Sequence, residues 1–245
     1  MRICKRSQLA ASGLMVMLPV LLAGTCGAQT RAYPLESRLD GMPIDLDQVP
    51  LTRALEWISL RSRENPVLFG AEVFTQHGQE PLVSVHIPGH STLREALTYV
   101  LATLPAYAFE AAAPQLINVF PRAASGDTTD LLNLRIPQFD LTNVPPGNVL
   151  NNPARYIPEL RTALTHGVPR SCEIGPGLSD KAPGVDVRVK NSTLRGILNA
   201  VSEASIGGAQ NHRGAALGWK YMREEFPSET VPGHTWRVLG VWRPG

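Results

Sequence analysis

Cysteine is nearly missing from this 245-residue chain, which holds only three. Two of them, Cys4 and Cys26, fall within the first 28 residues, and Cys172 is the third. A single thiol beyond that segment cannot form an internal disulfide. The chain must therefore depend on buried apolar cores. The roughly 217 residues that follow the segment suffice for two domains of about a hundred residues each.

Net charge and long apolar runs are lacking as well. The formal charge at pH 7 is +2, and removal of residues 1–28, with three basic and no acidic side chains, would leave −1. A near-neutral chain lacks the basic surface that binding to nucleic acid requires. Beyond residue 28 no stretch approaches the ~18 apolar residues of a membrane-spanning helix, so no transmembrane segment is predicted in the mature chain.

The first 28 residues have the layout of a secretory signal peptide. Three basic residues open the chain, an apolar stretch covers residues 14–23, and small residues run up to Ala28. We expect cleavage after Ala28 and a periplasmic or secreted protein. Lipid attachment at Cys26 is the less favoured alternative, because Thr25 stands where Gly, Ala or Ser normally precedes a modified cysteine.

One sequence pattern occurs twice, about a hundred residues apart. The matching segments are 45–50 with 140–145 at an offset of 95, 83–87 with 185–189 at 102, and 91–94 with 192–195 at 101. Two halves with one common layout are therefore predicted, with about seven residues inserted in the second half.

The layout predicted for the first half is β-α-β-β-α-β-β. This order belongs to the α+β class, with helices packed on small mixed sheets. The first helix should bury Leu51, Ala54, Leu55 and Ile58, which recur at helical spacing. The second should begin at a capping box and bury one apolar side between residues 93 and 104. Strands are predicted at 44–49, 65–70, 83–87, 106–110 and 115–120.

The second half is expected to repeat this layout with one irregular helix. Pro153 should break its first helix, so that residues 154–166 form a separate helical piece. Its second helix is predicted from Leu194 to Val201. Its closing strands are predicted at 217–222 and 235–242. The predicted organisation is a signal peptide at 1–28, a first module at 29–122, a linker at 123–130 and a second module at 131–245.

Four short motifs of the first half carry a family resemblance. They are Val49-Pro50-Leu51 followed by Ala54-Leu55, the strand Val83-Ser84-Val85, the helix start from Ser91 to Leu97, and the closing Ile117-Asn118-Val119. Together they resemble the short N-terminal domain of secretins and TonB-dependent receptors. The resemblance covers about residues 44–121, and residues 134–242 look like a diverged second copy. In that family the module lies in the periplasm and contacts envelope machinery or a signalling partner, so the resemblance implies protein binding.

Two groups of residues in the second half are candidates for a catalytic or a phosphate-binding site. Cys172 beside His166 and Glu173 could be a nucleophile with a base. No oxyanion donor or orienting group is identifiable in the sequence, so we expect an inert thiol. Gly175 and Gly177 could begin a phosphate-binding loop, but the prolines around them disfavour the helix that such a loop requires.

Histidines and aromatic residues also receive a structural interpretation. His77, His86 and His90 fall on a strand and in turns with no fixed ligand spacing, so we expect solvated side chains. The sequon at 191–193 coincides with a helix cap found in both halves. The aromatic residues of the closing strands are expected to form core or cross-strand contacts, with a sugar- or peptide-binding surface as the alternative: Trp219, Tyr221, Trp236 and Trp242.

These observations predict a function class but no reaction. No catalytic, cofactor-binding or metal-binding residue is singled out. The preferred hypothesis is an exported, non-enzymatic interaction module that binds another envelope protein through an exposed sheet edge or a helix-sheet cleft. The alternative is a small secreted enzyme, hydrolase-like, with a site assembled from scattered residues. A cleft where two titratable groups converge would favour the enzyme, and an unpaired edge strand would favour the module.

Overall fold

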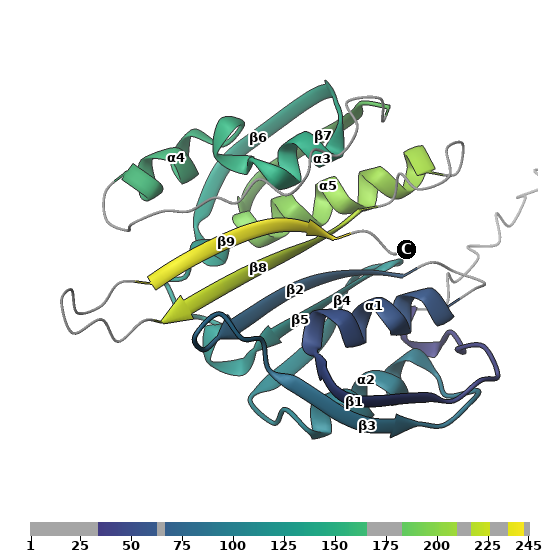
Figure 1. The fold of residues 1–245 in the computed structure, drawn as a ribbon. Coiled ribbons are helices and arrows are strands. Elements are labelled where there is room, and N and C mark those ends of the chain that lie inside the picture. Colours follow the sequence, from purple (N-terminus) through teal and green to yellow (C-terminus); the bar gives the residue numbers. More distant parts are fainter. Residues whose placement is uncertain (1–33, 63–66, 166–182, 210–216, 226–234, 243–245) are drawn as a thin grey trace, which may run out of the picture. The chain divides into compact units, whose positions relative to one another are not determined.

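A computed structural model describes residues 34–62, 67–165, 183–209, 217–225 and 235–242 of the chain. They form helices and strands of an α+β fold, which confirms the predicted fold class (Figure 1). None of the described helices is long and apolar enough to cross a membrane.

The elements fall into two halves of similar order. The first half holds β1 (Ile44–Pro50), α1 (Leu51–Arg61), β2 (Leu68–Thr75), β3 (Leu82–Ile87), α2 (Leu93–Ala102), β4 (Tyr107–Ala113) and β5 (Leu116–Pro121). The second holds β6 (Arg135–Val144), α3 (Pro146–Asn151), α4 (Pro158–Thr165), β7 (Val185–Thr193), α5 (Leu194–Ala209), β8 (Gly218–Glu225) and β9 (Thr235–Trp242). Short 3-10 turns are η1 (Pro34–Glu36), η2 (Arg122–Ala124), η3 (Leu131–Asn133) and η4 (Pro153–Arg155).

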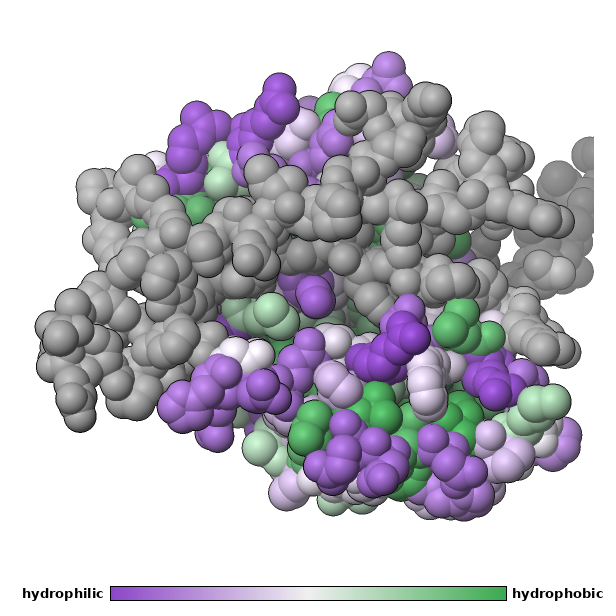
Figure 2. All heavy atoms as spheres, in the orientation of Figure 1, coloured by the Kyte–Doolittle hydropathy of each residue, from purple (hydrophilic) through white to green (hydrophobic). Residues whose placement is uncertain are grey.

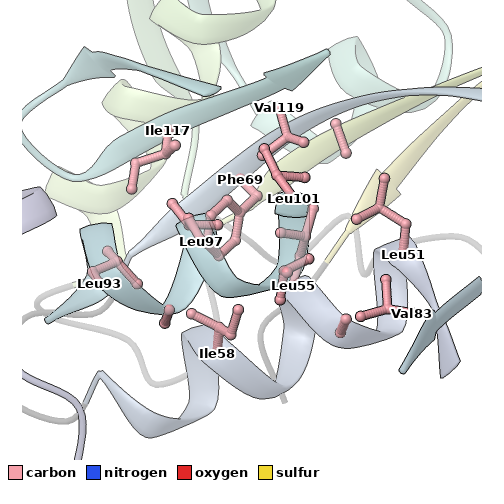
Figure 3. Close-up of a cluster of buried hydrophobic side chains, with 14 of the residues drawn as sticks. Leu51, Leu55, Ile58, Phe69, Val83, Leu93, Leu97, Leu101, Ile117 and Val119 are labelled. Carbon is pink, nitrogen blue, oxygen red and sulfur yellow. The ribbon is translucent and has the colours of Figure 1, made fainter. Parts of the chain in front are cut away.

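The first half encloses its own hydrophobic core. β1 pairs antiparallel with β3, and α1 and α2 contact this pair as well as the strands β2 and β4. The apolar side chains of both helices meet Phe69, Ile117 and Val119 of β2 and β5 in one core (Figure 3). The face of α1 predicted from helical spacing is the buried face, with Leu51 and Ile58 fully inaccessible. α2 begins at the predicted capping box, in which Thr92 and Glu95 exchange hydrogen bonds. Local sequence therefore determines both helices of this half.

The second half repeats the first in strand pairing and in backbone detail. β6 pairs antiparallel with β7, and the register shifts at the same place as between β1 and β3. At this bulge Gln48 and Asn143 have φ of 51° and 52°. Their backbone N–H groups donate to Ser84 Oγ at 2.9 Å and to Asp186 Oδ1 at 2.8 Å. Left-handed backbone also occurs in the corresponding residues before α2 and α5, His90 and Asn191.

The two halves differ after their first strands. α3 has six residues and ends at Asn151, and Pro153 starts the turn η4, as expected from a proline that interrupts a helix. α4 follows as the separate helical piece. In the part of the chain that the structure describes, no second-half strand corresponds to β2. The described order is therefore β-α-α-β-α-β-β.

One five-stranded sheet crosses from the first half into the second. Its order is β4-β5-β2-β8-β9, where β2 runs parallel to both β5 and β8. A sheet that both halves share was not anticipated from the sequence. The reason lies in β2, whose residues are buried on both faces: Phe69 packs in the first core, while Leu68 packs against Ile206 of α5. A strand covered on both faces belongs inside a sheet.

The predicted linker at residues 123–130 is also tied into the fold. Asp130 is buried, and its carboxylate accepts the backbone N–H of Leu132 at 2.7 Å. The Asn133 side chain donates to the backbone carbonyls of Ala124 and Asp127 at 3.0 and 2.8 Å. These bonds fix the path of the chain between the two halves.

Candidate functional site

β4 forms one edge of the five-stranded sheet. Among the described strands its partner is β5 alone. The Arg122 N–H donates to the Ala106 carbonyl at 2.7 Å, and residues with even numbers along β4 continue this set of bonded pairs. In an antiparallel ladder the alternate residues point their N–H and C=O groups away from the partner strand. Phe109 and Ala111 therefore direct their backbone groups to the open edge.

A groove lies beside the beginning of this edge, between the first three residues of β4 and the end of α2. It has a volume of about 350 Å³. Its lining combines apolar side chains with one cation and two hydroxyls: Thr98, Leu101, Ala102, Tyr107, Ala108, Phe109 and Arg122. An unpaired strand edge beside a largely apolar groove has the features of a site for strand addition. In strand addition, open backbone groups supply hydrogen bonds and a groove takes up alternate side chains.

In the second half, β2 occupies the place beside α5 and β8 that corresponds to this groove. Arg195 of α5 pairs with Glu72 of β2 at 2.7 Å. Near the other end of α5, Ile206 packs against Leu68. Between them, a side chain at Gly70 would overlap the ring of Trp219 on β8, so the strands approach closely there. β2 is thus held by one helix and one strand of the other half.

Charged side chains are concentrated where β2 meets α5 and β8. The Glu72 side chain is fully buried, and burial together with the nearby Asp130 raises its pKa to about 7 although Arg195 acts in the opposite direction. Arg223 of β8 lies 3.5 Å from both Asp130 and Asp127. A carboxyl with a raised pKa is a candidate for chemistry. Because no part of the Glu72 side chain is accessible, its role here is to join the halves.

The histidines considered as metal ligands lie at separate places. His77 occupies the turn after β2, and His90 the turn after β3. His86 lies on β3, with its Nδ1 at 2.6 Å from Asp45 Oδ1. The described residues contain no cluster of three or more His, Cys, Asp or Glu side chains that could hold a metal ion. The sequon residue Thr193 caps α5, because its hydroxyl accepts the Gly196 N–H at 3.2 Å.

The aromatic pair on β8 belongs to the core. Trp219 and Tyr221 are 0% and 2% exposed, and the Trp219 indole donates to Asn199 at 2.8 Å. Neither ring is available to stack on a ligand. The side chains of Trp236 and Trp242, and residues 166–182 with Cys172 and the two glycines, lie outside the described residues.

A further candidate surface is the outer side of the β1–β3 pair. On the side of the molecule where these strands lie, hydrophilic residues are interspersed with hydrophobic ones (Figure 2). Exposed positions there include Asp45, Asp47 and Ser84. Both strands are already paired with each other and their exposed side chains bond across the pair, as in the contact of Ser84 with Asp47 at 3.2 Å. The β4 edge is therefore the stronger candidate.

The sequence contained one signal for this arrangement that the strand predictions did not use. Residues 67–75 are apolar apart from Glu72 and Thr75, a pattern typical of a strand buried on both faces. Comparison with protein-family models, with curated proteins and with solved structures gives no match to this chain.

Proposed function

We propose that this chain is an exported cell-envelope protein that binds another protein, without catalysing a reaction, by accepting an extended segment of its partner at the β4 edge. The observation that carries the proposal is the open groove between α2 and β4. A groove in the same place in the second half already holds a strand.

The correspondence of the two grooves follows from the helices. α2 begins at Leu93 and α5 at Leu194, the offset of 101 found in the sequence repeat. At that offset Thr98 and Leu101 correspond to Asn199 and Ser202. Thr98 and Leu101 line the open groove. Asn199 and Ser202 lie on the same side of α5 as Arg195 and Ile206, the two residues that contact β2.

Two properties of the sequence support the envelope location. The N-terminal 28 residues have the pattern of a signal peptide, and the first half resembles the periplasmic module of secretins and TonB-dependent receptors. In that family the module contacts proteins. Protein binding at a sheet edge is compatible with both properties.

Site-specific crosslinking in intact cells tests the proposal. A photo-crosslinking residue replaces Glu110, which is exposed on β4, and, as a control, Arg53, which is 54% exposed on α1. We expect a discrete crosslinked product from position 110 and none of the same mass from position 53. A product from position 53 alone would contradict the proposal.

A proline substitution tests the role of the open backbone groups. Ala111→Pro removes an N–H that points to the open edge and fills its place with the ring, while the hydrogen bonds to β5 stay intact. We expect it to abolish the crosslink from position 110. Ala111→Val keeps the N–H and is the matched control, which should retain the crosslink. Equal crosslinking in both variants, with unchanged thermal unfolding, would show that strand addition is not the binding mode.

A further inference from the structure

We infer that the segment bound in the α2–β4 groove is a strand of a partner protein that runs parallel to β4, places an acidic side chain on Arg94, and carries an apolar side chain four residues before that acid. This inference rests on the proposed function. It adds the direction and the chemistry of the partner segment.

The direction follows from the filled groove. β2 runs parallel to β8, and β8 pairs antiparallel with β9 on its other side. β4 likewise pairs antiparallel with β5 on its closed side. A strand that occupies the open groove in the way β2 occupies the filled one is therefore parallel to β4. Its first residues lie near Tyr107 and its last near Ala113.

The chemistry follows from the contacts of β2. Glu72 meets Arg195 at the start of α5, and Leu68 meets Ile206 eleven residues further along that helix. Eleven helical residues span about 16 Å, and four strand residues span about 13 Å. The two spacings match, so an apolar residue followed by an acid four positions later fits a helix that presents a cation at its start and apolar groups near its end.

α2 presents a similar arrangement over a shorter span, because its groove-lining residues Leu101 and Ala102 lie seven and eight residues after Arg94, or about 11–12 Å along the helix. Arg94 corresponds to Arg195 at the offset of 101, and Leu101 and Ala102 line the groove near the end of α2. The described lining includes the cation Arg122 and no carboxylate. Charge complementarity therefore favours an acidic segment over a basic one.

Arg94 is available for such a contact. It currently pairs with Glu36 at 2.9 Å, and the two side chains are 52% and 56% exposed. Exposed ion pairs of this kind contribute little to stability, because water screens them and ordering of the side chains opposes them. Exchange of the Glu36 carboxylate for that of a partner is therefore a small step.

A synthetic peptide with the sequence of residues 67–75 is the probe, added to the full mature protein. Its fluorescein-labelled form reports affinity by anisotropy. We expect binding that Ala111→Pro abolishes and Ala111→Val retains. A peptide with Glu72→Lys should bind about tenfold more weakly. Arg94→Glu should reverse this preference, while Arg53→Glu on α1 should not change it.

A spin label on the amino end of the peptide reports direction. We expect it to broaden amide NMR signals near Tyr107 more than those near Ala113.

Binding that depends on the N–H of residue 111 but does not depend on the charge at position 94 would overturn this inference and leave the proposed function standing. Binding in the opposite direction would have the same consequence. Absence of binding by every peptide also overturns the inference. Self-association of the chain that Ala111→Pro abolishes would identify a second copy as the occupant instead. Loss of the crosslink pattern expected in cells would overturn the proposed function itself.

Discussion

Glu72 is the residue whose surroundings differ most from those of an ordinary carboxyl group. It lies near Arg195 of α5 and Asp130 of the segment between the halves, and its register partner on β8 is Tyr221. Arg223 of β8 in turn lies 3.5 Å from Asp130. The acids and the arginines balance in formal charge, but burial removes the water that would solvate them. A buried pair of this kind adds little net stability, although loss of one partner is costly.

Stability should therefore depend on the protonation of Glu72. The unfolded chain loses the Glu72 proton near pH 4.5, whereas the folded protein holds it up to about pH 7. Between these values the folded state binds more protons, so unfolding free energy should fall as pH rises from 4.5 to 7. The total effect is at most about 3 kcal/mol, from 1.36 kcal/mol per pKa unit.

Urea unfolding at a series of pH values measures this effect. The wild-type chain should lose stability across the window relative to Glu72→Gln, which cannot titrate. The difference between the two curves cancels the contributions of other groups. A difference that does not change with pH would mean that folding does not raise the pKa of Glu72.

At the scale of elements, the packing of β2 against β8 depends on the absence of a side chain at Gly70. A Cβ at Gly70 would overlap the Trp219 ring and lie 2.6 Å from Asn118 Oδ1. Because both neighbours are buried, Gly70→Ala should destabilise the protein by about 1–3 kcal/mol through overpacking. Chemical denaturation measures the loss. Ala112→Val adds volume at an exposed position of β4 and should have a much smaller effect, so equal losses would contradict the explanation.

The elements themselves were largely predictable, and their partners were not. The capping box at Thr92 and the spacing of Leu51 and Ile58 are local signals, which is why both helices of the first half agree with prediction. The choice of β8 as a neighbour of β2 depends on residues such as Trp219, far along the chain. The residue pattern within β2 does not predict that it pairs with β8.

The candidate site was predictable only in kind. An exposed sheet edge was expected, but β4 holds alanines at four of its seven positions and carries no sign of being the outer strand. Edge position is a property of sheet order, which becomes visible only once β2 is seen between β5 and β8. A binding role for Arg94 can likewise be inferred only after the structure shows that its counterpart Arg195 pairs with Glu72.

At the scale of the whole molecule, the proposed export predicts the mass of the mature protein. A signal peptide cut after Ala28 gives a mature chain that begins at Gln29. Intact-mass measurement of the protein recovered from the cell envelope should show the loss of residues 1–28. Retention of that segment, or a mass increase from lipid on Cys26, would contradict this.

The position of β2 also determines when the fold can be completed. Gly70 pairs with Asn118 on one side and with Trp219, 149 positions later, on the other. During synthesis β2 therefore presents an unfilled, apolar edge until almost the whole chain has been made. Contacts so distant in sequence slow folding and lengthen the exposure of aggregation-prone surface. A chaperone that shields β2 during this interval would therefore reduce aggregation.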